Sequence, residues 1–243
     1  MLEASPRPAF ARLFAAYVAW RLRRSFAGLT LSGVGNLEAS LARGPALALC
    51  SHSAWWDPMV LINLVHSRLQ IDPYVWMRGD SLRRLPFFAY LGAFGVDGRS
   101  PRDVLLALRY CAQLLETPAP RRLVCIYPQG RERPLTGRPW GVRRGAARLA
   151  RMVPTAAVLP LLIRYEMGAR PRPWLYVAWG APLTDGAEAE AQEAALSATY
   201  VQQDQQIAGT LAWHPDDRHE TWQGPAATTG GLGSRLLAGW TRQ

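Results

Sequence analysis

The sequence predicts an α/β fold with a largely parallel, mixed sheet that is flanked by helices. Two observations support this prediction. Short apolar runs, typical of buried strands, alternate along the chain with longer segments that have a helical period. The hydrophobic share of the 243 residues, 49%, is enough for one packed core. We expect one central domain over residues 27–212, between an N-terminal amphipathic helix (1–26) and an irregular tail (213–243).

A helix is predicted for the first 26 residues because Phe10, Leu13, Phe14 and Tyr17 share one helical face. Positive charge gathers toward its C-terminal end, where the helix dipole favours cations, at Arg21, Arg23 and Arg24. Such a helix suits two settings equally well. One is the interface of a membrane with anionic lipids, and the other is packing against the core of the domain itself.

The remaining elements follow in order along the chain. A weak alternation around two glycines predicts an edge strand over Leu29–Leu37. Short apolar runs predict the strands Pro45–Cys50, Pro73–Met77, Leu123–Tyr127, Ala156–Ile163 and Trp174–Trp179. Helical periodicity predicts the helices Pro58–Val65, Ser81–Tyr90, Pro101–Glu116, Val142–Met152 and Gly186–Ala208. The tail from Trp213 is rich in glycine, proline and threonine, which predicts loop or partial disorder.

The charge balance favours an anionic partner. The 28 basic residues, all of them arginine, exceed the 18 acidic ones, and the chain has 10 tryptophans. This combination suits either a membrane surface or a nucleic acid. No apolar run reaches the length of about 18 residues that a membrane span needs, and no secretory cleavage pattern is present. The three cysteines form no metal-binding pair and are predicted to be core residues in a reducing compartment.

The loop after Pro45–Cys50 carries the strongest chemical signal. A buried strand delivers His52 at its carboxyl end, where α/β sheets place ligand sites. Asp57 stands immediately before Pro58, which predicts that it caps the next helix. Its second carboxylate oxygen would then be free to hold one ring nitrogen of His52, leaving the other nitrogen as a general base.

Four short motifs follow one another along the chain. They are SHSAWWD at 51–57, LGAFGVDGR at 91–99, YPQGRER at 127–133 and VLPLL at 158–162. In this order they resemble the four blocks of the lysophospholipid and glycerolipid acyltransferases (PlsC-like). Those blocks are NHxSxxD, a Gly-x-Phe segment that leads to an arginine, FPEGTRS, and an apolar strand with a proline. The His-x4-Asp core of the first block is intact, with Ser51 in the place of the asparagine.

The resemblance implies an O-acyltransferase. It would move a fatty acyl group from a thioester donor, acyl-CoA or acyl-carrier protein, to a hydroxyl of a lysophospholipid, glycerol phosphate or related lipid-like acceptor. No metal and no redox cofactor are implied. His52 and Asp57 would form the catalytic pair, and the backbone amide of Gly130 is a candidate donor to the oxyanion. Trp55 and Trp56 flank the loop and are predicted to line the site of the acyl chain.

The third block departs from the family pattern. Gln129 stands for the glutamate, Arg131 for the threonine and Glu132 for the arginine. Together with Gly130, the residues Gln129, Arg131 and Arg133 are predicted to bind the head of the acceptor at the sheet edge that also carries His52. Glu132 is interpreted as a solvated residue of a charged loop.

In the second block, Arg99 is a candidate ligand of an acceptor phosphate. Because the third block is altered, the sequence does not establish that the acceptor carries a phosphate. It leaves open a sugar or a terpenoid alcohol as the acceptor, acylated by the same chemistry.

Other functions stay open at this point. A catalytically weak, lipid-binding family member fits the altered third block, and a basic nucleic-acid-binding module fits the charge. A serine hydrolase would need a nucleophile-elbow motif, and none is present. For an acyltransferase with a basic amphipathic helix, we expect a cytoplasmic protein that is peripheral on the inner face of the cell membrane, where lipids are anionic. Its oligomeric state stays undetermined.

Overall fold

The computed structural model describes residues 1–97, 100–168, 171–184, 186–211 and 220–223. Among these residues, eight strands form one sheet in the order β4-β3-β5-β2-β6-β7-β1-β8. In chain order the strands are β1 Gly28–Ser32, β2 Ala46–Cys50, β3 Asp72–Arg78, β4 Ala93–Val96, β5 Arg122–Ile126, β6 Ala157–Glu166, β7 Trp174–Trp179 and β8 Glu220–Gln223. The strands from β4 to β6 in this order pair in parallel, whereas β7 is antiparallel to β6, and β8 is antiparallel to β1. The predicted α/β fold with a largely parallel, mixed sheet is confirmed.

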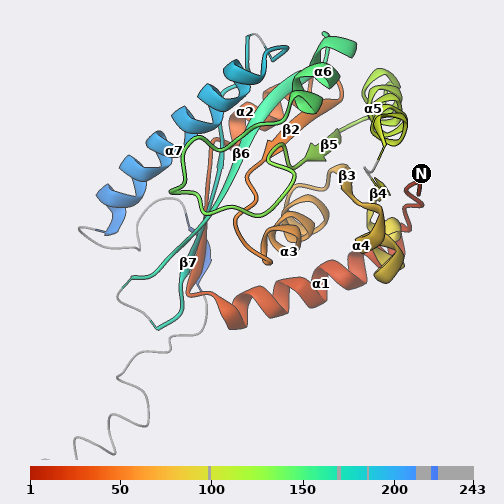
Figure 1. Ribbon diagram of the computed structural model, residues 1–243. Helices are drawn as coiled ribbons and strands as arrows, with labels where there is room; N and C mark the ends of the chain where they lie inside the picture. Colours follow the sequence, from red (N-terminus) through yellow and green to blue (C-terminus); the bar gives the residue numbers. More distant parts are fainter. Residues whose placement is uncertain (98–99, 169–170, 185, 212–219, 224–243) are drawn as a thin grey trace, which may run out of the picture.

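Helices cover both faces of the sheet (Figure 1). On one face lie α1 Pro8–Ser25, α2 Val34–Leu41 and α3 Asp57–Ile62, which share a hydrophobic cluster. On the other face lie α5 Pro101–Glu116, α6 Arg144–Met152 and α7 Ala189–Leu211. The short helix α4 Gly79–Arg84 joins β3 to a 3₁₀ turn, Pro86–Leu91, that leads into β4. A π-helical turn, Asn63–Arg68, extends α3.

Strand β2 lies at the centre of the sheet, between β5 and β6. All five of its residues are buried, and they alternate between the two hydrophobic clusters, as the period of a strand requires. Leu49 pairs with Ile126, the last residue of β5. The segments that follow β2 and β5 therefore emerge side by side at one edge of the sheet, as the sequence predicts for the loops after these two strands.

Helix α1 uses a different face for its core contacts than the spacing of its large side chains predicts. Its buried residues are small or aliphatic: Ala11, Ala15, Val18 and Leu22. Phe10 and Phe14 are half-buried and pack against the ring of Phe87. Leu13 and Tyr17, on the predicted apolar face, are exposed. Helix α1 thus packs against the domain through its face of small and aliphatic residues, while part of the face that the spacing marked is left exposed, so contact of that face with a membrane stays a prediction.

The predicted edge strand Leu29–Leu37 is wrong in length and in position. Strand β1 ends at Ser32, because Gly33 adopts a left-handed conformation (φ +66) and begins the turn into α2. A side chain at Gly33 would also collide with the carbonyl oxygen of Trp179. Strand β1 lies between β7 and β8, so it is not the edge of the sheet.

Other segments also differ from the predictions. The predicted helix Ser81–Tyr90 is divided at Pro86, whose ring disfavours helical backbone at Leu85. The short strand β4 was not predicted, because it has only four residues and contains Gly95. In the predicted irregular tail, Glu220–Gln223 forms β8 and pairs with β1. The rest of that tail lies outside the described residues.

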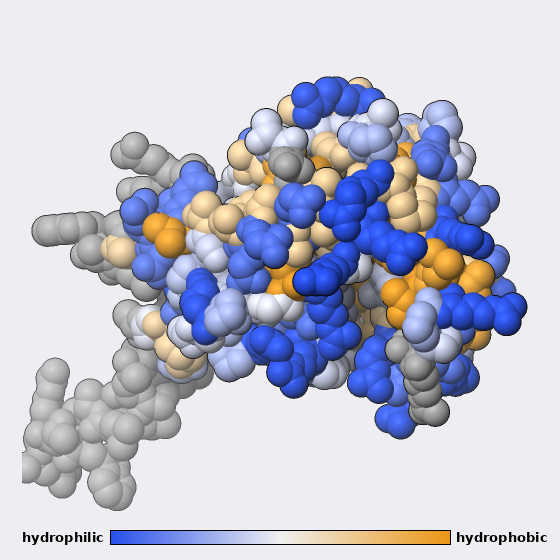
Figure 2. All heavy atoms as spheres, turned by 45° about the horizontal axis from the view of Figure 1, so that its top comes forward, coloured by the Kyte–Doolittle hydropathy of each residue, from blue (hydrophilic) through white to orange (hydrophobic). Residues whose placement is uncertain are grey.

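Hydrophilic side chains cover much of the face drawn in Figure 2. The most hydrophobic side chains gather mainly in a patch at the right of that view. Each of the three cysteines is buried and free, in agreement with the prediction of core residues. Within the part of the chain that the structure describes, every helix is too short or too polar to cross a membrane.

Candidate active site

The residue after β2, Ser51, still forms hydrogen bonds to the neighbouring strand β6. The amide of Ser51 donates to the carbonyl of Leu161 at 2.8 Å, and its hydroxyl accepts from the amide of Ile163 at 3.0 Å. Ser51 is fully buried, so its hydroxyl is engaged by β6 and is inaccessible as a nucleophile. Its two bonds fix the point at which His52 leaves the sheet.

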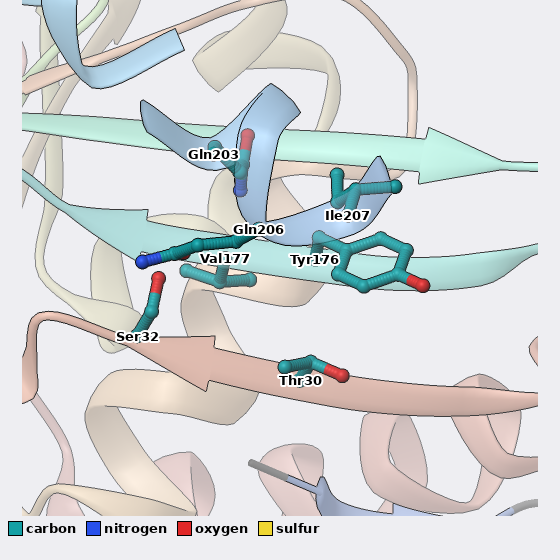
Figure 3. Close-up of a pocket in the computed structure, with 7 residues that line it drawn as sticks. All are labelled: Thr30, Ser32, Tyr176, Val177, Gln203, Gln206 and Ile207. Atoms are coloured by element: carbon teal, nitrogen blue, oxygen red, sulfur yellow. The ribbon is translucent and has the colours of Figure 1, made fainter. Parts of the chain in front are cut away.

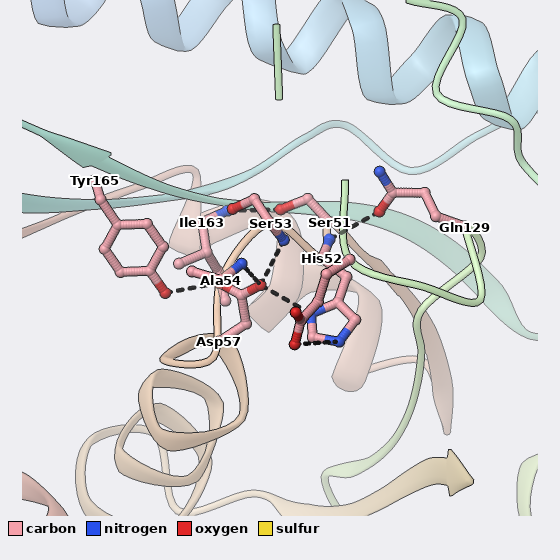
Figure 4. Close-up of polar contacts among 9 residues, drawn as sticks. Ser51, His52, Ser53, Ala54, Asp57, Gln129, Ile163 and Tyr165 are labelled. Atoms are coloured by element: carbon pink, nitrogen blue, oxygen red, sulfur yellow. Dashed lines mark hydrogen bonds and ion pairs between the residues drawn. The ribbon is translucent and has the colours of Figure 1, made fainter. Parts of the chain in front are cut away.

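His52 and Asp57 contact each other as the sequence predicts. Nδ1 of His52 lies 3.0 Å from Oδ2 of Asp57, and the His52 side chain is 17% exposed (Figure 4). Asp57 is completely buried. Its Oδ2 also accepts from the amides of Ser53 and Ala54, at 2.7 and 2.9 Å, and its Oδ1 accepts from the hydroxyl of Tyr165 at 2.6 Å. Four donors thus replace the water that a buried carboxylate loses.

The prediction that Asp57 caps helix α3 is wrong. Trp56 occupies the N-cap position, and Asp57 is the first helical residue. Its carboxylate turns back onto the preceding loop and accepts from two amides there, which folds residues 53–57 into a tight turn. The backbone of Asp57 therefore forms the first turn of α3, while its side chain contacts His52.

Two tyrosines that the sequence analysis did not single out surround the pair. Burial raises the pKa of Tyr165, and the neighbouring Asp57 carboxylate raises it further, so the phenol stays protonated and donates to Asp57. The ring of Tyr127 lies against the imidazole of His52, with 4.4 Å between the centroids. Its hydroxyl is buried and has no hydrogen-bond partner among the residues that the structure describes, and burial raises its pKa strongly. Tyr165 lies 108 residues from Asp57 in sequence, so no local pattern connects them.

Gln129 supports the backbone of His52 and is too buried to contact an acceptor substrate. Its Oε1 accepts from the His52 amide at 2.8 Å, and the residue is 1% exposed. Its Nε2 is buried and has no hydrogen-bond partner within the described ranges. The expectation that Gln129 offers a donor and an acceptor group to the substrate therefore fails on the acceptor side, because the carbonyl oxygen is already engaged.

The loop after β5 is held in place by several backbone contacts. The amide of Arg133 donates to the carbonyl of His52 at 2.8 Å. The loop is therefore bonded to the His52 backbone at two points, through Gln129 and through Arg133. Farther on, the carboxylate of Glu193 on α7 accepts from the amides of Trp140 and Val142. These bonds tie the loop to the helix layer beneath it.

Gly130 and Arg133 differ from their expected roles. The amide of Gly130 donates to the carbonyl of Tyr127 at 2.9 Å, so this amide is not free to donate to an oxyanion. Gly130 has φ +66, and a Cβ at this position would collide with the guanidinium of Arg143. Nη1 of Arg133 donates to the carbonyl of Trp140 at 3.2 Å, and Nε of Arg133 is buried. Arg133 therefore braces the loop.

Glu132 was interpreted as a solvated residue of a charged loop, and it is exposed, but it also lies beside the histidine. Its Oε1 is 3.8 Å from Nε2 of His52, and its side chain is 57% exposed. Arg131 is exposed on the same loop. Arg99 lies outside the described residues.

The two tryptophans of the loop divide their roles. Trp56 is half-buried and packs edge-on against Phe26, with 5.2 Å between the ring centroids. Trp55 is 63% exposed and contacts the ring of Trp56 in a T-shaped arrangement. Of the two predicted acyl-chain contacts, only Trp55 presents most of its surface to the outside.

Two hollows of the described structure lie away from the His52 loop. One lies between β1, β7 and α7 and is lined by Thr30, Ser32, Tyr176 and glutamines of α7 (Figure 3). A wider one lies between the start of α1 and the N-terminal ends of β3 and β5. Within the described ranges, histidine, cysteine and acidic side chains form no group of three that could hold a metal ion.

The comparison with protein families agrees with this arrangement. A family model described as Acyltransferase matches residues 32–164, which is more than half of the chain and runs from the end of β1 into β6. The match includes His52, Asp57 and the loop after β5. No curated protein matches the chain. The family match supports a general acyltransferase activity, and the chain belongs to the acyltransferase family, that of the PlsC-like lysophospholipid and glycerolipid acyltransferases.

Proposed function

We propose that the protein transfers a fatty acyl group from an acyl thioester, acyl-CoA or acyl-carrier protein, to a hydroxyl of a lipid-like acceptor, with His52 as the general base. The observation that carries the proposal is the contact between His52 Nδ1 and Asp57 Oδ2 at 3.0 Å. It holds the tautomer in which Nδ1 carries the proton and Nε2 presents a lone pair. Nε2 lies on the partly open side of the ring, next to the loop after β5.

The reaction then needs no protein nucleophile. The hydroxyl oxygen of the acceptor attacks the thioester carbonyl carbon while its proton moves to Nε2 of His52. The C–S bond of the tetrahedral intermediate breaks, and the leaving thiolate takes the proton back from the imidazolium. Asp57 stabilises the imidazolium between these two steps.

The geometry of Asp57 supports this role. If the Asp57 carboxylate only held the loop in shape, its bonds to the amides of Ser53 and Ala54 would be sufficient. The further contacts to the His52 ring and to Tyr165 hold it in one orientation from both sides. Such a fixed charge beside an imidazole favours the protonated state that forms during transfer.

Donors to the oxyanion must come from a group other than Gly130. In the loop after β5, the amides of Arg131 and Glu132 donate to no acceptor among the described residues. They are the candidates that this loop offers.

We also propose that the protein works on an anionic lipid surface, with the outer face of α1 and Trp55 in contact with the lipid. Leu13, Tyr17 and Trp20 recur at helical spacing on α1 and are 72%, 52% and 50% exposed. The guanidinium of Arg24 lies 5.2 Å from the Trp20 ring. An apolar stripe with aromatic residues and flanking arginines suits the depth of lipid head groups.

The same surface reaches the proposed catalytic loop. Arg21 of α1 lies 5.8 Å from the ring of Trp56, which in turn contacts Trp55. Because Trp55 is only three residues from His52, a lipid that meets the outer face of α1 would also meet the entrance to the site. A nucleic-acid-binding module and a catalytically weak lipid-binding member are the alternatives, and neither requires the fixed His52–Asp57 pair.

Thiol release tests the enzymatic proposal. The purified protein, oleoyl-CoA and a hydroxyl-bearing lysolipid should release CoA and form an acylated lipid together. His52→Ala should lower this rate by about 100- to 10,000-fold, the usual contribution of a positioned base. His66→Ala is the matched control, since His66 contacts the Leu91 carbonyl on another element. Wild-type turnover in a folded His52→Ala protein would exclude His52 as the base.

A further inference from the structure

The loop after β5 places an acidic side chain on the open nitrogen of His52. Glu132 Oε1 lies 3.8 Å from His52 Nε2, the nitrogen that does not contact Asp57. This distance is too long for a hydrogen bond and close enough for a strong electrostatic influence. A carboxylate in this place is not needed for the proton transfer that we propose.

The backbone brings Glu132 to this place. His52 donates its amide to Gln129 and accepts from the amide of Arg133, each at 2.8 Å, and Glu132 lies between these two anchors (Figure 4 shows the first). The two anchors fix the backbone at Glu132, and its side chain, which is 57% exposed, reaches His52 from this position. Its proximity to His52 therefore follows from the loop itself.

The reacting hydroxyl must come to the same nitrogen. A base accepts a proton over a heavy-atom distance of roughly 2.6–3.2 Å, so the acceptor oxygen must lie close to Nε2. Groups on the neighbouring carbon atoms of the acceptor then lie within a few ångströms of the Glu132 carboxylate. They meet a negative charge and a hydrogen-bond acceptor with no donor of its own.

We infer that Glu132 determines which acceptor is used, an inference that rests on the proposed acyl transfer. The acceptor is a neutral or cationic lipid that carries a second hydrogen-bond donor, a vicinal hydroxyl or an ammonium group, next to the reacting hydroxyl. That donor binds the Glu132 carboxylate. A phosphate in the same position is repelled, so glycerol phosphates and their monoacyl derivatives are poor acceptors.

The arginines of the loop do not reverse this selection. The guanidinium of Arg133 donates to the Trp140 carbonyl, and that of Arg143 occupies the space beside Gly130 into which a Cβ at this position would point. Arg131 is the one opposing feature on residues 129–133, because it is positive, exposed and adjacent to Glu132. Both side chains are exposed and screened by water, but the Glu132 carboxylate lies 3.8 Å from Nε2 of His52, the nitrogen to which the acceptor hydroxyl must come.

A paired-acceptor assay tests the inference. The full chain is given oleoyl-CoA with either 1-oleoylglycerol or 1-oleoylglycerol 3-phosphate in detergent micelles. Dihexadecyl phosphate, which carries a negative charge and no alcohol hydroxyl, is added with the neutral acceptor to keep the micelle charge equal in the two mixtures. The measured quantity is the ratio of kcat/KM for the neutral acceptor to that for the phosphate acceptor.

We expect wild-type protein to favour the neutral acceptor by about tenfold or more, the scale of a charge repulsion near a protein surface. Glu132→Gln keeps the size and removes the charge, so it should lower this ratio by about tenfold. Glu132→Arg should lower it further. Glu116→Gln, at an exposed position at the end of α5, is the charge-matched control and should leave the ratio unchanged.

A wild-type preference for the phosphate acceptor, or an unchanged ratio in Glu132→Gln, overturns the selection by Glu132 while acyl transfer itself stands. A protein that acylates neither acceptor, with wild-type and His52→Ala indistinguishable, overturns the proposed function together with the inference.

Discussion

The hydroxyl of Tyr165 donates to Oδ1 of Asp57 at 2.6 Å, across 108 residues of sequence. Strand β6 thereby reaches the residue that holds His52, and its contact lies on the carboxylate oxygen that the histidine does not use. Because burial keeps the phenol protonated, this bond persists over the whole neutral pH range. Tyr165 is thus a positioning residue for the His52–Asp57 pair.

Tyr165→Phe and Tyr127→Phe should have opposite effects. The first removes a hydrogen bond to a buried charge and should lower the free energy of unfolding by about 1.5–3 kcal/mol. It should also lower kcat, since Asp57 loses a fixed partner. The second removes a buried hydroxyl that has no hydrogen-bond partner in the described part of the chain, so stability should stay the same or rise. Urea unfolding and steady-state turnover of both variants check this, and equal destabilisation would contradict it.

The outer face of α1 should be needed for lipid binding and dispensable for folding. Replacing Leu13, Tyr17 and Trp20 together by glutamine should weaken binding to anionic vesicles by about tenfold or more, because apolar burial at the interface is lost. Sedimentation with vesicles measures this, and added salt should weaken wild-type binding.

A matched control for this experiment lies on the opposite face of the sheet. Leu106 on α5 and Val201 on α7 are also exposed apolar residues. Their replacement by glutamine should leave vesicle binding unchanged. Equal loss in both sets, or equal binding to neutral and anionic vesicles, would argue against α1 as the lipid-contacting face.

Stability should decrease as the pH falls through the range in which His66 titrates. Burial lowers the pKa of His66, only partly opposed by its contact with the Leu91 carbonyl. The unfolded chain therefore binds this proton more readily than the folded protein, and stability is lost as the pH drops below the ordinary histidine value of about 6.5. His66→Gln should have a smaller decrease in unfolding free energy between about pH 7 and pH 5. Identical pH slopes for variant and wild type would contradict this.

The sequence predicted the parts of the site that depend on local order along the chain. His52 follows a buried strand and Asp57 follows it closely, so their contact could be expected. The meeting of the loops after β2 and β5 followed from the shared edge of a parallel sheet. These features need only strand assignments and spacing.

The partners of those residues could not be predicted, because they depend on sheet order and on loop conformation. Tyr165 reaches Asp57 only because β6 lies beside β2. Gln129 was expected to face the substrate and instead supports the His52 amide, and the Gly130 amide closes a turn. Glu132 is exposed as expected, but its proximity to His52 could not be predicted, because it depends on two hydrogen bonds to the His52 backbone that no sequence pattern indicates.

A double-mutant cycle on His52 and Asp57 tests the central claim most directly. The rate of acyl transfer is measured for wild type, His52→Ala, Asp57→Asn and the double variant, with folding checked by near-ultraviolet circular dichroism. The Asp57→Asn substitution retains a side-chain oxygen for the Ser53 and Ala54 amides and removes the charge. If the two residues act as one unit, each single variant should lose about 100- to 10,000-fold and the double variant little more than His52→Ala. Near-wild-type activity in Asp57→Asn, or losses that multiply in the double variant, would contradict the account.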